Sequence, residues 1–138
     1  MFKVVFDTNV IISALYNPNG RPASLLKSAR KGQIRNFISA PILAEVQRIL
    51  SDKLNWPKTE VSIAINWLQG FSTVVEPKTH LEVISDPPDN RILECALESQ
   101  ADYIVSGDHH LTDLQHFKGI KIIAPSKFEK ILERPLTV

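Results

Sequence analysis

Short apolar runs alternate along the chain with longer amphipathic stretches, and this alternation predicts the fold class. Val4, Val5 and Phe6 form a run of β-branched and aromatic residues that is typical of a strand buried on both faces. Similar runs cover residues 36–40, 72–76 and 121–124, and another begins at Tyr103. Between them, apolar residues recur at helical spacing. We therefore expect an α/β fold with a parallel sheet of about five strands flanked by helices.

The amphipathic stretches have clear beginnings and ends. Pro41 suits the first position of a helix, while Gly32 and Gly70 each follow the last apolar residue of a stretch. No Asn-Gly hairpin signal separates two alternating runs, which favours a parallel sheet. The helices are expected at residues 10–16, 22–31, 41–53, 59–69 and 125–132, with one entered through the rigid segment 85–90 and one or two turns within 110–116.

The size and composition predict a single domain over residues 1–138. Charged residues make up 22% of the chain but the net charge is only +1, so nucleic-acid binding would need a local basic patch or bound metal ions. Cys95 is the only cysteine, so no internal disulfide can form, and we expect it in the core of a cytoplasmic protein. No apolar run suggests a membrane span or a signal peptide.

Four acidic residues occupy positions where an α/β fold places chemistry. Asp7 and Asp108 each follow a predicted strand, and ligands of open α/β sheets bind outside the carboxyl ends of strands. Asp89 falls in the first turn of a helix, on its buried side, and Glu45 falls at the rim of an apolar helix stripe. We expect these four side chains to meet in one cleft.

Each acid also has a structural explanation. Glu45 could be solvated, as rim glutamates usually are. Asp86 could cap the helix that begins at Pro87, leaving Asp89 placed to bond back to the cap. Asp108 could be a turn residue or a helix cap.

Carboxylates that share a cleft repel one another unless protons or cations relieve the charge. Oxygen donors, without a second cysteine or a suitably spaced histidine pair, favour Mg²⁺ or Mn²⁺ over zinc. Such ions can activate a water and stabilise the leaving oxygen of a phosphodiester. Metal-dependent phosphodiester cleavage is therefore the leading hypothesis.

Four segments together resemble the PIN domain family, of the kind found as toxins of bacterial and archaeal toxin-antitoxin pairs. They read D-T-N-V from Asp7, P-I-L-A-E-V, D-P-P-D-N-R-I-L-E-C-A and A-D-Y-I-V-S-G-D-H-H-L. The resemblance implies a Rossmann-like sheet and a metal-dependent ribonuclease site. The matching acidic positions are Asp7, Glu45, Asp89 and Asp108, and the supporting polar positions are Thr8, Asn9 and Ser106.

The resemblance also implies an RNA substrate, a cognate antitoxin and a homodimer. One departure is His110, where many relatives carry a further acid. His109 and His110 are adjacent, and we expect their side chains to diverge too far to share one ion, although His109 could contact RNA.

Two other functions compete with this one. Transfer through an aspartyl phosphate, as in receiver-like folds, would need an aspartate after the third strand, where the chain has Glu76 and Pro77. The other alternative is a non-catalytic RNA- or protein-binding module of the same fold.

The basic cluster of Lys27, Arg30, Lys31 and Arg35 could bind phosphates or simply form a solvated face. Trp56 and Trp67 are expected in the core or an interface.

Overall fold

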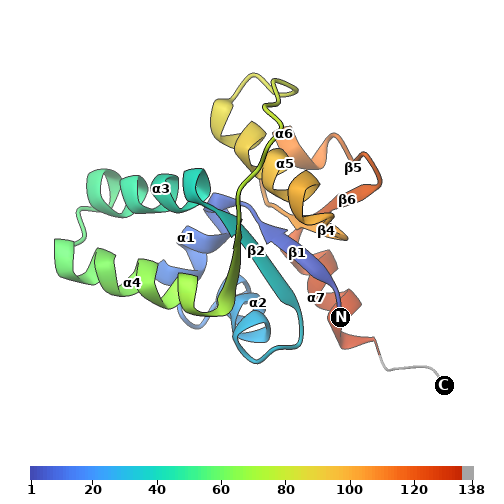
Figure 1. Ribbon diagram of the computed structural model, residues 1–138. Helices are drawn as coiled ribbons and strands as arrows, with labels where there is room; N and C mark the ends of the chain where they lie inside the picture. The colour runs from blue at the N-terminus through green and yellow to red at the C-terminus, as the bar shows by residue number, and fades with distance from the viewer. Residues whose placement is uncertain (135–138) are drawn as a thin grey trace.

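Six strands form one sheet in the computed structural model, which describes residues 1–134 (Figure 1). The strand order is β3-β2-β1-β4-β6-β5, and every neighbouring pair is parallel except β5 with β6. The expected α/β fold with its parallel sheet is confirmed, with one antiparallel strand added at an edge. The strands are β1 (Lys3–Phe6), β2 (Arg35–Ser39), β3 (Ser72–Val75), β4 (Tyr103–Val105), β5 (His116–Phe117) and β6 (Ile120–Ile123).

The β5–β6 hairpin contradicts the expectation that hairpins are absent. Its two-residue turn has positive φ at Lys118 (49°) and Gly119 (84°), as the favoured tight hairpin turns require. The pattern was missed because lysine takes the place of the usual asparagine and because β5 is too short to show alternation. The helix expected within 110–116 is correspondingly shorter and lies earlier, at His109–Thr112.

The helices match the amphipathic stretches closely, with one exception. The stretch 41–53 does not form a single α-helix, because a π-helical turn, η1, replaces its end. Ile42, Val46 and Leu50 are buried four residues apart up to and into this turn, so the apolar spacing does not reveal the change in hydrogen bonding. No helix within residues 1–134 is long and apolar enough to cross a membrane. The helices are α1 (Thr8–Tyr16), α2 (Arg21–Arg30), α3 (Ala40–Arg48), η1 (Ile49–Lys53), α4 (Lys58–Phe71), α5 (Pro87–Ser99), α6 (His109–Thr112) and α7 (Pro125–Glu133).

Helices cover both faces of the sheet. On one side α2 packs against α1 and α7, while α5 packs along β1 to β4 (Figure 1). Val4, Val5 and Phe6 are almost completely buried, as expected for a strand covered on both faces. Phe6 meets Phe128 of α7 with ring centroids 6.5 Å apart. Cys95 of α5 is buried in the same core, as predicted.

The order of the strands creates a crevice beside β1. The chain builds β1, β2 and β3 outward in one direction and then returns through α5 to place β4 on the other side of β1. Connections on either side of this reversal leave the sheet on opposite faces, so the carboxyl ends of β1 and β4 border an open space. The residues that follow Phe6 and Val105 therefore lie where a ligand site is expected.

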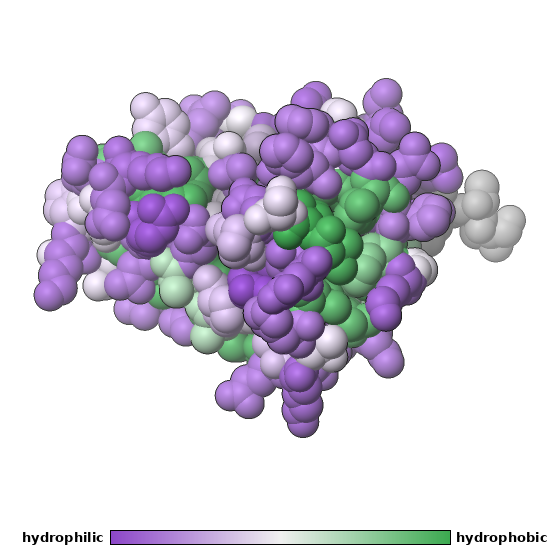
Figure 2. Space-filling view, turned by 90° about the horizontal axis from the view of Figure 1, so that it is seen from above, coloured by the Kyte–Doolittle hydropathy of each residue, from purple (hydrophilic) through white to green (hydrophobic). Residues whose placement is uncertain are grey.

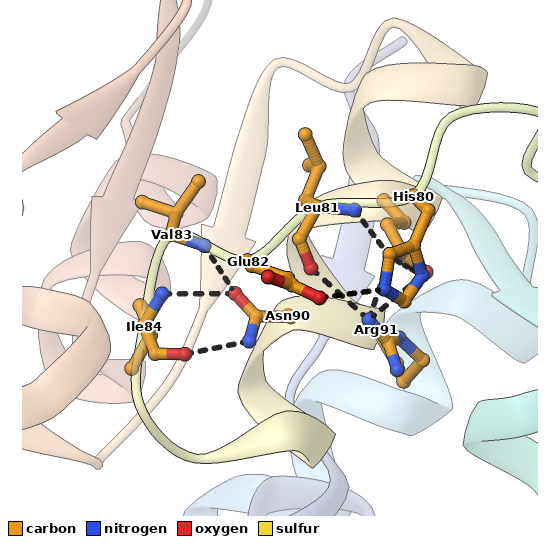
Figure 3. Close-up of polar contacts among 8 residues, drawn as sticks. His80, Leu81, Glu82, Val83, Ile84, Asn90 and Arg91 are labelled. Atoms are coloured by element: carbon orange, nitrogen blue, oxygen red, sulfur yellow. Dashed lines mark hydrogen bonds and ion pairs between the residues drawn. The ribbon is translucent and has the colours of Figure 1, made fainter.

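A strap of residues 76–86 crosses from β3 to the start of α5 (Figure 1). The buried Asn90 side chain accepts hydrogen bonds from the N–H groups of Val83 and Ile84, both at 2.9 Å, and donates to the Ile84 carbonyl oxygen (Figure 3). Glu94 accepts from the Leu81 N–H and from Arg91 Nη2, both at 2.8 Å. These contacts tie the strap to the first turns of α5.

Candidate functional site

All four predicted acids line one cavity of about 250 Å³ at the carboxyl ends of the strands. Four separate segments supply them: the end of β1, helix α3, the start of α5 and the loop after β4. The four side chains therefore border one cavity. The lining residues are Asp7, Thr8, Asn9, Glu45, Arg48, Ile49, Lys53, Asp86, Pro88, Asp89 and Asp108.

Ser106 connects two of the acids. Its fully buried hydroxyl donates to Asp7 Oδ2 at 2.8 Å and accepts from the backbone N–H of Asp108 at 3.0 Å. The sequence placed Ser106 among the supporting residues, and its contacts give that position a physical reason. One hydroxyl fixes the Asp7 carboxylate relative to the loop that carries Asp108.

Asp7 lines the cavity and is almost completely buried. Burial raises its pKa above the ordinary value, and the charge of Asp108 adds to that rise. The Ser106 hydroxyl and the backbone N–H groups of Thr8 and Asn9 lower the pKa and offset part of the rise. Thr8 and Asn9 thus support Asp7 through their backbone as well as lining the cavity.

Asp89 is 5% exposed, and its Oδ2 atom is buried without a hydrogen-bond partner. Burial and the charges of Asp108, Asp7 and Asp86 raise the pKa of Asp89 to about 7, although His110 acts in the opposite direction. A carboxylate oxygen buried beside other acids and left without a donor is costly unless a proton or a cation satisfies it.

The structural explanation offered for Asp86 and Asp89, side-chain capping of α5, is not what the fold shows. Asp86 occupies the N-cap position, but its side chain makes no capping hydrogen bond. Pro87 and Pro88 remove the first two N–H groups of the helix, and the N–H of Asp89 bonds to the Asp86 backbone oxygen at 3.1 Å. The Asp89 carboxylate is therefore not used as a capping group.

Asp108 does act as a cap. Its Oδ1 accepts from the N–H of His110 at 2.9 Å at the start of α6, while the residue also lines the cavity. Asp108 can therefore both cap α6 and take part in the site, because the cap uses only one of its two carboxylate oxygens.

Glu45 lies in the cavity wall together with Arg48, one helical turn further along. Arg48 Nη2 donates to Glu45 Oε1 at 2.7 Å and Arg48 Nε donates to Oε2 at 3.1 Å. These bonds hold the pKa of Glu45 below its usual range. Lys53, at the end of η1, adds a second positive charge to the same wall. Sequence reasoning missed both basic residues, although the i, i+3 spacing of Glu45 and Arg48 was a usable signal.

The donor set fits a divalent cation of the Mg²⁺ or Mn²⁺ type. Asp7, Asp89 and Asp108 offer only oxygen atoms, which are the ligands these ions prefer, and Asp89 Oδ2 is buried without a partner. Five acids line the cavity, against the two basic residues Arg48 and Lys53. The cavity therefore has the chemistry of a cation site.

The other candidates from the sequence lie away from this cavity. Arg35 begins β2 and is paired with Lys3, so the basic cluster around it lies at the amino ends of the strands, opposite the acids. Glu76 follows β3 at the edge of the sheet and does not line the cavity, which disfavours the receiver-like alternative.

Trp67 is 37% exposed on α4 and packs edge-on against Phe71. The face seen from above in Figure 2 is mostly hydrophilic.

The raised pKa of Asp89 predicts that Asp89→Asn changes the free energy of unfolding in a pH-dependent way when a chelator keeps the protein metal-free. A folded-state pKa of about 7 exceeds the unfolded value, so this group lowers stability as pH rises from about 4 to about 7. The Asp89→Asn variant has no carboxylate to ionise, so its stability does not fall with pH in this way. We expect it to be more stable than the parent by about 1–2 kcal/mol at pH 8, since water screens part of the effect, and nearly equal at pH 4. Urea unfolding at both pH values measures the difference; an equal difference at both would contradict the assignment.

Comparisons with known proteins agree with this fold. The protein-family model described as PIN domain matches residues 3–110. An uncharacterized protein from Methanocaldococcus jannaschii is 39% identical over 117 residues, which cover 82% of this chain and 75% of that protein. A chain in the crystal structure of VapBC2 from Rickettsia felis, bound to a DNA fragment from their promoter, has the same fold, with a TM-score of 0.63. The two chains are 17% identical, and the match covers 88% of this chain and 98% of that one. The family resemblance is thus confirmed, and the chain belongs to the PIN domain family.

Proposed function

We propose that this PIN domain is a metal-dependent endoribonuclease and the toxin of a toxin-antitoxin pair. PIN domains are generally metal-dependent nucleases. The observation that carries the proposal is the shared cavity, in which acids from four segments line one space and Asp89 Oδ2 is buried without a partner.

In this proposal Asp7, Glu45, Asp89 and Asp108 hold Mg²⁺ or Mn²⁺. A bound cation of this kind would lower the pKa of water and offset the negative charge that develops on a phosphodiester. Asp7 has the strongest support for a central role, because the Ser106 hydroxyl holds its buried carboxylate in place beside the cavity. Asp89 and Asp108 supply further oxygen donors at the same edge of the sheet.

Arg48 and Lys53 suit contact with the phosphates of RNA. Both line the acidic cavity, and Arg48 already orients Glu45 through two hydrogen bonds. Since the whole chain has a net charge of only +1, local positive charge of this kind is needed to attract a polyanion. The π-helical turn that ends at Lys53 brings the second charge to the cavity.

The proposal includes a partner protein and an oligomeric state. The structural similarity to a chain of VapBC2 motivates a cognate antitoxin, although at 17% identity it shows the fold alone. A homodimer and a cytoplasmic location stay predictions, as does the single domain over residues 1–138. The alternative function remains a non-catalytic RNA- or protein-binding module of the same fold.

The direct test is cleavage of a panel of RNAs by the chelator-treated chain, with Mg²⁺ or Mn²⁺ added back. We expect cleavage only with metal, together with Mn²⁺ binding detectable by calorimetry. RNA binding that is equal in chelator, without Mn²⁺ binding and without cleavage, would favour the non-catalytic module instead.

Lys53→Met tests the phosphate contact. Loss of one charge at the cavity should weaken RNA binding and reduce the slope of log affinity against log salt by about 0.7, the value for one phosphate contact with a single strand. Binding of labelled RNA, measured at several salt concentrations in a non-cleaving variant background, gives this slope. Lys130→Met, at an exposed site on α7, serves as the matched control. An equal loss in both variants would indicate general electrostatics instead of a local contact.

A further inference from the structure

A second set of metal-binding side chains lies beside the acidic cavity, where α6 begins. Asp108, His109 and His110 each offer one donor atom, and these atoms lie within 4.8 Å of one another. Among residues 1–134, no other group of three or more acidic, histidine or cysteine side chains comes this close. The two imidazoles play no part in the oxygen-donor site proposed above.

The two histidine rings lie side by side, which corrects the expectation that they diverge. Their centroids are 4.3 Å apart and their planes differ by 37°. The expectation assumed a regular strand or helix, but these residues form the first turn of a four-residue helix. There, Asp108 Oδ1 accepts the His110 N–H and brings the carboxylate over the turn.

The distances suit one bound ion. Asp108 Oδ1 lies 3.2 Å from His110 Nδ1 and 3.9 Å from His109 Nδ1. Bonds of about 2.0–2.1 Å to a tetrahedral Zn²⁺ place neighbouring donor atoms roughly 3.4 Å apart. The two observed distances lie on either side of that value, so small rotations of exposed side chains complete the arrangement.

The loop that carries these ligands is held in place. The Ser106 hydroxyl accepts the Asp108 N–H at 3.0 Å and is itself fully buried against Asp7. The Leu111 side chain, directly after the two histidines, is completely buried. The backbone of the ligand set is thus anchored at both ends, while the imidazoles remain open to solvent.

We propose that Asp108, His109 and His110 form a binding site for a divalent cation of the Zn²⁺ or Co²⁺ class. Two imidazole nitrogens and one carboxylate oxygen favour such ions over Mg²⁺, which prefers oxygen alone. With three protein ligands and exposed histidines, a fourth position stays open to water or to a substrate group. The site shares Asp108 with the acidic cavity but does not depend on RNA cleavage.

The test uses the full chain without a histidine tag, treated with chelator and then titrated with Co²⁺. Visible absorption reports a nitrogen-containing cobalt site, and competition with a chromophoric chelator gives the Zn²⁺ affinity. We expect one nitrogen-containing site, which His109→Ala or His110→Ala weakens by about 10-fold to 100-fold or more, since even outer-shell losses cost that much. His116→Ala, at an exposed histidine outside the set, should leave the affinity unchanged.

Asp7→Asn separates this site from the acidic cavity. We expect that variant to keep the cobalt absorption and the Zn²⁺ affinity within about threefold, because Asp7 is not one of the three ligands. An unchanged affinity in the double variant His109→Ala/His110→Ala, or the absence of any Zn²⁺ or Co²⁺ binding by the parent, overturns the inference. So does an equal loss in Asp7→Asn, since the ion would then occupy the acidic cavity. These readouts are independent of the cleavage assay.

Discussion

Asp7→Asn is expected to lower metal-dependent RNA cleavage by about 100-fold or more while leaving the fold intact. Removing even an outer partner of a metal ligand costs 10–100-fold, and Asp7 is proposed as a ligand itself. Its burial and its bond from Ser106 indicate that the carboxylate cannot be replaced by a neighbouring side chain. Cleavage rates at saturating Mn²⁺, together with the unfolding midpoint, measure both parts of the prediction.

The stability of this variant matters as much as its activity. Because burial raises the pKa of Asp7, its charged form is costly in the metal-free protein, and a neutral amide of the same shape should not lower the unfolding midpoint. Asp113→Asn makes the same chemical change at an exposed residue that does not line the cavity. Parent-like cleavage by Asp7→Asn would remove the proposed mechanism, whereas a loss in both variants would point to an indirect cause.

Asn90→Ala is expected to destabilise the protein by about 2–4 kcal/mol. The change removes three hydrogen bonds and leaves the N–H groups of Val83 and Ile84 and the Ile84 carbonyl oxygen without their partner. Residues 83 and 84 of the strap would then lose their attachment to α5, whose first turn carries Asp89. Urea unfolding measures the loss, and faster hydrogen exchange in residues 81–85 would locate it.

Two controls define the origin of that effect. Asn66→Ala makes the same substitution at an exposed position of α4 and should change stability by no more than about 0.5 kcal/mol. Asn90→Asp keeps an acceptor for two of the three bonds and should cost less than alanine, provided that nearby Asp89 does not repel it. If Asn90→Ala unfolds like the Asn66 variant, the strap is not held by these bonds.

The elements of the fold were largely readable from apolar spacing. Val4, Val5 and Phe6 predicted a doubly covered strand, and the helical spacing of apolar residues within 22–31 predicted α2, because burial follows periodicity in regular elements. The errors fell where geometry departs from these periods. The π-helical turn after Arg48 and the tight turn at Lys118 and Gly119 are set by local hydrogen bonding, which apolar spacing does not encode.

The candidate site divides in a similar way. The type and position of each acid could be read along the chain, since Asp7 and Asp108 follow strands and Asp89 begins a helix. The side chains that bond to these acids could not be predicted from the sequence. That Arg48 neutralises Glu45 and that Ser106 joins Asp7 to Asp108 depends on side-chain orientation across elements.

By itself, the sequence determined the alternation of strands and helices, the acids at their ends and the family, because these follow from local pattern and from the order of motifs. Only the tertiary structure decided that the acids share one cavity, that Asp89 Oδ2 lies buried without a donor, and that the two histidines stand together. The physical reason is that electrostatics and coordination depend on separations of a few ångströms between residues up to about a hundred positions apart. Those separations exist only once the return through α5 places β4 beside β1.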